Sequence, residues 1–211
     1  MTARVHILDD DADVRDALDS LLRAEAFEVM LHDTHEAFLD AYDEARNCCL
    51  LLDVRLGDVD GLDVQAALPG RGIDVPVIVM TGHGDVPMAV RGMKAGAIDF
   101  LSKPFPDDAL LGAIDRALAR DCARLAASAE RTALQGRYAL LTPREREVAG
   151  LVVAGLMNKQ IAGRLGLELV TVKIHRGQAM RKMEAQSLAD LVRMLERLGV
   201  RATGISRYGA D

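Results

Sequence analysis

The feature that most constrains the fold of this chain is an alternation, over roughly its first half, between short apolar runs and stretches with helical spacing. The runs are rich in β-branched and aliphatic residues and cover Val5–Leu8, Glu28–Leu31, Leu50–Leu52, Val75–Met80 and Ile98–Leu101. Strands that are apolar almost throughout are typical of a parallel sheet covered by helices on both faces. We therefore predict an α/β domain with a doubly wound, five-stranded parallel sheet.

The rest of the chain predicts an all-α domain of four helices, over about 143–154, 158–165, 169–184 and 187–198. Thr142 can cap the first helix, Pro143 suits its first position, and Glu145 completes a capping box. Asn158 and Ser187 are predicted to cap two later helices. The second helix breaks at a glycine and the third begins three or four residues later, which is the spacing of a helix-turn-helix.

A long helix that begins near Asp107 is predicted to join the two domains, and Gln135-Gly136 is its expected end because glycine readily adopts the left-handed cap conformation. Its 4-3-4-3 spacing is compatible with a solvated linker or with a dimerising seam, and involves Leu118, Cys122, Leu125, Ala129 and Thr132. The expected domains are residues 1–121 and 140–211, with a helical linker over 122–139.

Charge divides along the same boundary. Residues 1–121 hold 24 acidic and 11 basic residues, a net charge of −13, whereas residues 122–211 hold 8 acidic and 15 basic residues, a net charge of +7. A nucleic acid is the natural partner for a basic domain, although basic faces are often merely solvated.

Nothing in the sequence predicts a membrane partner. No run approaches the roughly 18 apolar residues of a membrane span, and the N-terminus shows no signal-peptide pattern. Cys48, Cys49 and Cys122 lack the spacing of a metal site, so we expect three reduced core residues in a cytoplasmic protein.

Acidic residues follow two of the predicted strands. Asp9 and Asp10 come after the first strand and Asp53 after the third, while Thr81 and Lys103 follow the fourth and fifth. Ligands of open α/β sheets bind at the carboxyl ends of the strands. If the first and third strands are neighbours, the three carboxylates lie within a few ångströms of one another and need a cation, for which Mg²⁺ is the best match.

A carboxylate nucleophile, a metal, a hydroxyl and a lysine are the components of phosphoryl transfer. Asp53 would attack, Asp10 and Asp53 would hold Mg²⁺, and Lys103 and Thr81 would stabilise the transferring oxygens. The segments LDD, LLLDVRLGDVDG, VMTGHGD and MKAGAIDFLSKPF resemble the receiver domain of two-component response regulators over residues 4–120. The resemblance implies a sensor histidine kinase as phosphoryl donor.

The receiver resemblance implies further roles and reveals one departure. It implies Asp9 in the second coordination shell of the metal, the backbone carbonyl of Arg55 as a ligand, and a cis Lys103-Pro104 bond. It also implies that Thr81 moves toward the phosphoryl group and lets Phe100 turn inward. The family usually has proline where Gly57 stands in Leu56-Gly57-Asp58, so acceptor positioning and phosphoryl lifetime are expected to differ. His83 is interpreted as a loop residue.

The segments LTPREREV, NKQIAGRLGL and VTVKIHRGQAMRKM resemble the LuxR-type helix-turn-helix, arranged as in regulators of the FixJ type. In the third helix, Val172, Ala179 and Met183 share one face by helical spacing. The opposite face is predicted to enter the major groove of double-stranded DNA. The expected DNA-binding residues are Thr171, Lys173, Ile174, Arg176, Gly177, Arg181 and Lys182, of which Arg176 and Lys182 are assigned to phosphates.

The sequence thus predicts a response regulator in which phosphorylation of Asp53 promotes homodimerisation and DNA binding, with RNA polymerase as a further partner. Two alternatives stay open. A regulator could bind DNA without phosphorylation, and a phosphatase of the haloacid-dehalogenase type uses similar groups. The phosphatase alternative is disfavoured because Arg55 stands where such an enzyme carries its second aspartate.

Overall fold

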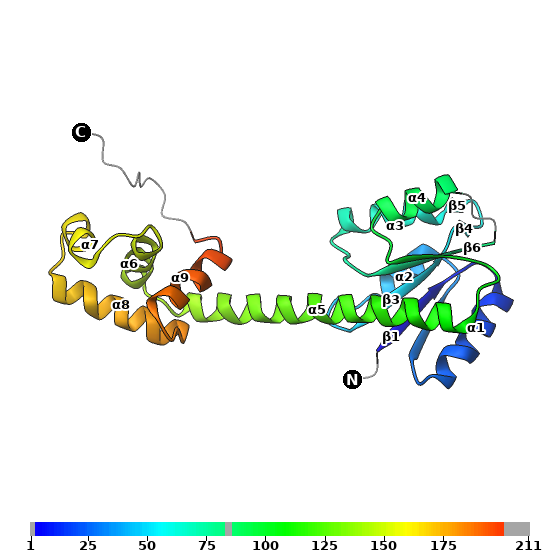
Figure 1. The fold of residues 1–211 in the computed structure, drawn as a ribbon, viewed down its shortest axis with the longest axis horizontal. Coiled ribbons are helices and arrows are strands. Elements are labelled where there is room, and N and C mark those ends of the chain that lie inside the picture. Colours follow the sequence, from blue (N-terminus) through cyan, green and yellow to red (C-terminus); the bar gives the residue numbers. More distant parts are fainter. Residues whose placement is uncertain (1–2, 83–85, 201–211) are drawn as a thin grey trace. The chain divides into compact units, whose positions relative to one another are not determined.

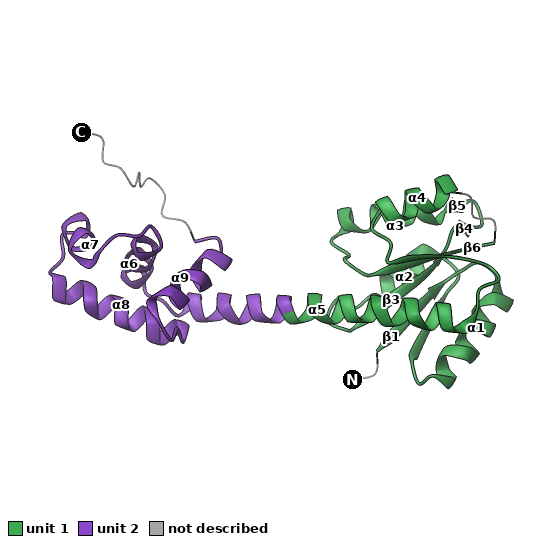
Figure 2. Ribbon diagram, in the orientation of Figure 1, with its two compact units in different colours: residues 1–126 green, residues 127–211 purple. Residues whose placement is uncertain are grey.

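The computed structural model describes residues 3–82 and 86–200 and divides into two compact units, residues 1–126 and 127–211 (Figure 2). Unit 1 is built on a five-stranded parallel sheet in the order β2-β1-β3-β6-β7, which confirms the predicted fold class. The strands are β1 (Arg4–Leu8), β2 (Glu28–His32), β3 (Cys48–Asp53), β6 (Val77–Thr81) and β7 (Asp99–Ser102).

Helices cover both faces of this sheet (Figure 1). α1 (Ala12–Ala24) and the first part of α5 (Asp107–Ala139) pack on one face, where Leu22 and Ile114 are fully buried. α2 (His35–Ala41), α3 (Gly61–Ala67) and α4 (Val86–Lys94) lie on the other face, where Phe38 is fully buried. The short helix η1 (Pro69–Arg71) follows α3.

A small hairpin that the sequence analysis did not predict follows β3. β4 (Arg55–Leu56) and β5 (Val59–Asp60) pair antiparallel and leave Gly57 and Asp58 as the two turn residues. Gly57 has a φ of +60°, and glycine at the first position suits a tight hairpin turn. The hairpin fixes the course of the chain directly after Asp53.

Unit 2 contains the last turns of α5 and the four predicted helices: α6 (Pro143–Val153), α7 (Asn158–Leu165), α8 (Leu169–Met183) and α9 (Leu188–Arg197). The capping box is confirmed, because Glu145 N–H donates to Thr142 Oγ1 at 3.3 Å and Thr142 N–H donates to Glu145 Oε2 at 2.8 Å. Ser187 caps α9 through a 3.1 Å hydrogen bond from Asp190 N–H.

Three local predictions are wrong. α5 does not end at Gly136 but continues to Ala139, because the residues after Gly136 make contacts in unit 2 that outweigh the roughly 1 kcal/mol cost of a helical glycine: Tyr138 packs against its core and Arg137 pairs with Glu184 at 2.6 Å. Asn158 does not cap α7: Met157 holds the cap position, and Asn158 Oδ1 accepts a hydrogen bond from Arg176. Cys122 is exposed, since its neighbour Asp121 takes the buried position, whereas Cys48 and Cys49 are buried as expected.

Over residues 3–82 and 86–200, no helix combines the length and the apolarity that a membrane crossing needs.

Candidate functional site

β1 and β3 are neighbouring inner strands, and both end at the carboxyl-terminal end of the sheet. The two strands pair in register, with Leu8 opposite Leu52, so Asp9 and Asp53 come next to each other. Both are almost fully buried, with exposed fractions of 1% and 7%. Two carboxylates in such a position need positive partners.

Lys103 supplies that positive charge. Its Nζ lies 2.6 Å from Asp9 Oδ2 and 2.7 Å from Asp53 Oδ1. Lys103 follows β7, and its N–H donates to the carbonyl of Thr81 at 2.7 Å. The Lys103-Pro104 bond is cis, as the resemblance implied. Lys103 thereby links the end of β7 to the carboxyl ends of β1, β3 and β6.

Burial and charge act on these groups in opposite directions. Burial alone would lower the pKa of Lys103, but hydrogen bonds to Asp53 and Asp9 outweigh it and raise the pKa above its ordinary value. Burial raises the pKa of Asp53, and the hydrogen bonds from Lys103 and from Arg55 N–H oppose this rise in part. The ammonium therefore stays charged at neutral pH.

Asp10 is not part of this buried group. It is exposed, and its Oδ2 accepts a 2.9 Å hydrogen bond from Gly57 N–H in the β4–β5 turn. Asp9 Oδ1 accepts from Asp11 N–H at 3.0 Å, and Asp53 Oδ2 accepts from Arg55 N–H at 2.6 Å. Among the described residues, no three His, Cys, Asp or Glu side chains are grouped so that they could hold a metal ion. The structure thus brings together two of the three expected carboxylates.

Gly61, at the start of α3, is a site residue that the sequence analysis missed. A Cβ at this position would lie 2.1 Å from the carbonyl oxygen of Asp53, so only glycine allows so close an approach. Gly61 N–H donates to the carbonyl of Val54 at 2.8 Å. Gly61, the last residue of LLLDVRLGDVDG, was visible in the sequence, but its close approach to the carbonyl oxygen of Asp53 was not.

Thr81 and Phe100 lie on the neighbouring strands β6 and β7. Thr81 is buried, and its Oγ1 lies 4.0 Å from Met88 Sδ on α4. Phe100 is half-buried and packs with the residues under α3 and α4. A Cβ on Gly92 of α4 would lie 3.6 Å from the Phe100 ring, an ordinary van der Waals distance, so α4 packs directly against Phe100. His83 lies outside the described residues.

The second candidate surface is the exposed face of α8. Val172, Ala179 and Met183 are fully buried, as the helical spacing predicted. Gly166, with a φ of +63°, ends α7 and leads into α8 as in a helix-turn-helix. The opposite face of α8 is exposed and carries Val170, Lys173, Ile174, Gly177 and Arg181.

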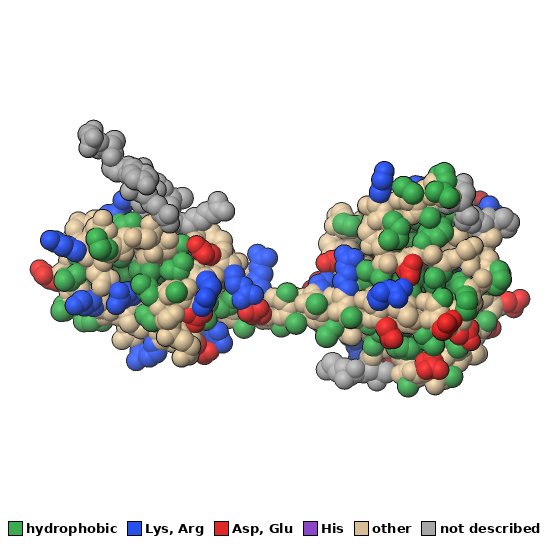
Figure 3. All heavy atoms as spheres, in the orientation of Figure 1, with side chains coloured by type: hydrophobic (Ala, Val, Ile, Leu, Met, Phe, Trp, Pro, Cys, Tyr) green, Lys and Arg blue, Asp and Glu red, His purple; other side chains and the backbone are tan. Residues whose placement is uncertain are grey.

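The α8 residues at the margins of this exposed face are less accessible. Thr171 and Arg176 are half-buried, and Arg176 Nη1 donates to Asn158 Oδ1 at 3.2 Å. Lys182 Nζ forms a 2.7 Å ion pair with the buried Glu145. A phosphate contact by Lys182 would require this pair to open, so Lys182 is less available to DNA than Lys173. Lys and Arg side chains, with some Asp and Glu among them, are spread over the visible face of unit 2 (Figure 3).

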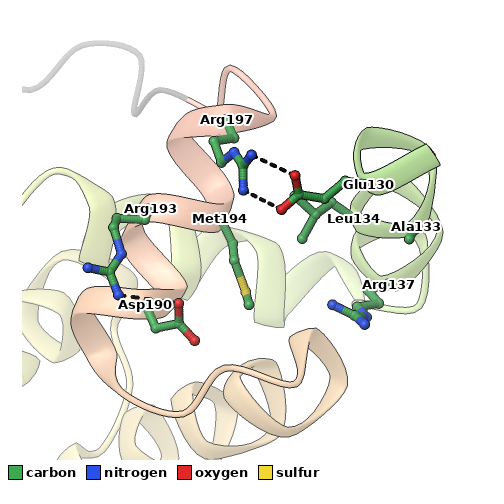
Figure 4. Close-up of a pocket in the computed structure, with 8 residues that line it drawn as sticks. All are labelled: Glu130, Ala133, Leu134, Arg137, Asp190, Arg193, Met194 and Arg197. Atoms are coloured by element: carbon green, nitrogen blue, oxygen red, sulfur yellow. Dashed lines mark hydrogen bonds and ion pairs between the residues drawn. The ribbon is translucent and has the colours of Figure 1, made fainter. Parts of the chain in front are cut away.

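Unit 2 also contains a cavity of about 590 Å³ between the last turns of α5 and α9 (Figure 4). Arg197 donates to both carboxylate oxygens of Glu130, at 2.5 and 2.7 Å, on one side of it. Leu134 and Met194 line its apolar part. None of its lining residues belongs to α8, so this cavity is separate from the candidate DNA surface.

The fold and the two surfaces define a class of protein: one with buried carboxylates and a lysine at the carboxyl end of a doubly wound sheet, and with a helix-turn-helix in a second unit. Comparison with known families agrees with both parts. The family described as "Response regulator receiver domain" matches residues 5–115, and the family described as "Bacterial regulatory proteins, luxR family" matches residues 139–195.

Individual relatives extend over both units. Nodulation protein W of Bradyrhizobium diazoefficiens is 47% identical over 200 residues, covering 95% of this chain and 88% of the relative. The transcriptional regulatory protein FixJ of Rhizobium meliloti is 45% identical, covering 90% of this chain and 93% of the relative. The solved structure of the response regulator StyR has a TM-score of 0.82 at 43% identity, covering 93% of this chain and all of that chain.

The chain therefore belongs to the response regulators with a receiver domain and a LuxR-type DNA-binding domain. It is a transcription regulator of the two-component type.

Proposed function

We propose that Asp53 is the residue that accepts the phosphoryl group, from a phosphohistidine of a sensor histidine kinase. The observation that carries this proposal is the buried Asp53 carboxylate at the carboxyl end of β3, with Lys103 Nζ 2.7 Å from its Oδ1. An Asp53 oxygen forms the new bond to phosphorus, and the bond to the histidine nitrogen breaks. Lys103 is in position to neutralise the charge that Asp53 and the phosphoryl oxygens share.

The donor set at the site fits Mg²⁺. Only oxygen ligands are proposed: the carboxylates of Asp10 and Asp53 and the backbone carbonyl of Arg55, with Asp9 in the second coordination shell. Mg²⁺ is commonly held by one or two carboxylates and keeps several waters, so a ready group of three acids is not required. When bound, the ion supplies charge neutralisation at the transferring oxygens.

Thr81 and Phe100 are proposed to pass the signal on. A phosphoryl group on Asp53 offers a new acceptor to the Thr81 hydroxyl at the end of the adjacent strand. If Thr81 moves toward it, the contact between Thr81 and Met88 of α4 changes, and Phe100 can turn inward. This is a population shift between two packings, biased by one charge-assisted hydrogen bond.

The output is proposed to be homodimerisation and sequence-specific binding of double-stranded DNA by α8, in a cytoplasmic protein that also contacts RNA polymerase. Lys173 and Arg181 are the exposed cations on the face opposite the buried one and are assigned to base or phosphate contacts. Thr171, Ile174 and Gly177 complete this surface, and Arg176 and Lys182 flank it.

Labelling with acetyl phosphate and Mg²⁺ tests the acceptor. The wild-type chain is expected to take up the phosphoryl group, and Asp53→Asn is expected to abolish uptake because the amide is not a nucleophile of this kind. Asp58→Asn is the matched control, an exposed carboxylate in the same loop, and should label as the wild type does. Uptake by Asp53→Asn at the normal rate would refute the assignment.

A further inference from the structure

The hydrogen bond between Gly57 and Asp10 links two loops of the acceptor site. Gly57 lies in the turn that follows Asp53, and Asp10 lies in the loop that follows β1. The distance from Gly57 N to Asp10 Oδ2 is 2.9 Å. The bond therefore connects a proposed metal ligand to the chain segment that carries the acceptor.

Position 57 makes two demands on its residue. The turn requires a positive φ, which is +60° at Gly57, and the contact with Asp10 requires a backbone N–H. Proline would meet neither demand, because its φ is fixed near −65° and it has no N–H. Glycine meets both, and no heavy atom lies within 4 Å of where its Cβ would be, so steric crowding is not the reason for glycine.

Asp10 differs from the other two carboxylates in how it is held. Asp9 and Asp53 are buried and are fixed by Lys103 and by backbone donors. Asp10 is exposed, so its side chain would sample several rotamers without a local contact. The Gly57 N–H occupies Oδ2 and leaves Oδ1, with its lone pairs, for another ligand.

We propose that the Gly57 N–H is a positioning group for the metal site: it holds Asp10 in the orientation in which its second oxygen ligates Mg²⁺. This inference rests on the proposed Mg²⁺ site. Carboxylates that ligate metals are in turn hydrogen-bonded, and removal of such a partner typically weakens metal affinity by about 10- to 100-fold.

The first test is a titration of the full chain with magnesium chloride, in which isothermal titration calorimetry measures the Kd for Mg²⁺. Gly57→Pro removes the N–H and is expected to raise the Kd for Mg²⁺ by about tenfold or more. Gly57→Ala is the matched control, since it keeps the N–H but strains the turn, and should raise the Kd by less than about threefold. Equal affinity of the wild type and Gly57→Pro, or equal losses in the two variants, would overturn the proposal.

The second test needs no substitution, because proline also alters the turn. In the wild-type chain labelled with ¹⁵N and ¹³C, NMR coupling across the hydrogen bond between Gly57 N and Asp10 Cγ is expected before and after saturation with Mg²⁺. Loss of the coupling on Mg²⁺ binding would contradict this inference but not the proposed metal site, since the amide and the ion would then compete for the Asp10 carboxylate. Failure of the wild type to bind Mg²⁺ would overturn the proposed metal site and this inference with it.

Discussion

At the scale of single residues, His6 shows most clearly how burial shifts the pKa of a titratable side chain. Its imidazole, on β1, is fully buried, and its Nδ1 lies 2.9 Å from Nε2 of His32 on β2. The two rings stack with centroids 5.2 Å apart, and Phe38 packs edge-on against both. Burial lowers the pKa of His6 to about 4, with a smaller contribution from His32, whose own pKa burial also lowers. Both rings are therefore neutral at pH 7.

This pair makes unit 1 sensitive to mild acid. The pKa of His6 is about 4 when folded and about 6.5 when unfolded, so the unfolded chain binds more protons between these values. The free energy of unfolding should therefore fall as pH drops below about 6.5, by up to about 1.4 kcal/mol per pH unit, until about pH 4. Urea unfolding between about pH 7 and about pH 5 should show this loss, and His6→Leu should reduce it. His35→Gln is the control, and an unchanged pH dependence in His6→Leu would contradict the argument.

At the scale of elements, one buried carboxylate ties α5 to the sheet. Asp121, on α5, is fully buried and accepts Cys48 N–H, at the start of β3, at 2.9 Å. Its other oxygen accepts Arg124 Nε at 2.7 Å. Arg124 in turn donates to the carbonyl of Glu44 at 3.0 Å. The helix is therefore fixed against unit 1 where its apolar packing ends.

Asp121→Ala should lower the free energy of unfolding of unit 1 by about 2–4 kcal/mol, because it leaves a buried N–H without an acceptor and removes the partner of Arg124. Asp121→Asn keeps an acceptor oxygen and should cost less. Asp115→Ala, at an exposed position of the same helix, is the control and should change stability by less than about 0.5 kcal/mol. If Asp121→Ala matched the control in chemical denaturation, the tie would have no energetic role.

The elements also show what a sequence can predict. The five long strands and α6 to α9 could be predicted because their apolar spacing is local. The β4–β5 hairpin was missed because two-residue strands have no periodicity, and only Gly57-Asp58 signalled a turn. The end of α5 was misplaced because the packing of Tyr138 in unit 2 outweighed the local preference of Gly136.

The candidate site divides in the same way. Asp9, Asp53 and Lys103 could be placed together because parallel strands align their carboxyl ends. The bond between Asp10 and Gly57 could not be predicted, because it depends on the turn of an unpredicted hairpin. The ion pair of Lys182 with Glu145 was missed for a related reason: helical periodicity describes α8 alone, whereas the pair depends on how α6 packs against it.

At the scale of the whole molecule, the two units carry opposite net charges. The chain as a whole has a net charge of −6, so it should be repelled by DNA at long range. Attraction must come from the basic residues of unit 2, at distances comparable with the Debye length of about 8 Å at physiological salt. Binding of DNA should therefore weaken steeply with salt, because phosphate contacts release counterions.

The last prediction joins the acceptor to the DNA surface. With beryllofluoride and Mg²⁺ as the phosphoryl mimic, the wild-type chain should dimerise and bind a DNA fragment selected from random sequence more tightly, whereas Asp53→Asn should respond in neither way. Lys173→Ala should weaken specific binding by about 1–3 kcal/mol with or without the mimic, because it removes a contact and leaves the receiver intact. Arg131→Ala, at an exposed position of α5, is the control. Titrations at fixed salt, with oligomeric state measured by light scattering, separate the outcomes: an affinity that ignores the mimic indicates constitutive binding, and full affinity of Lys173→Ala removes Lys173 from the DNA surface.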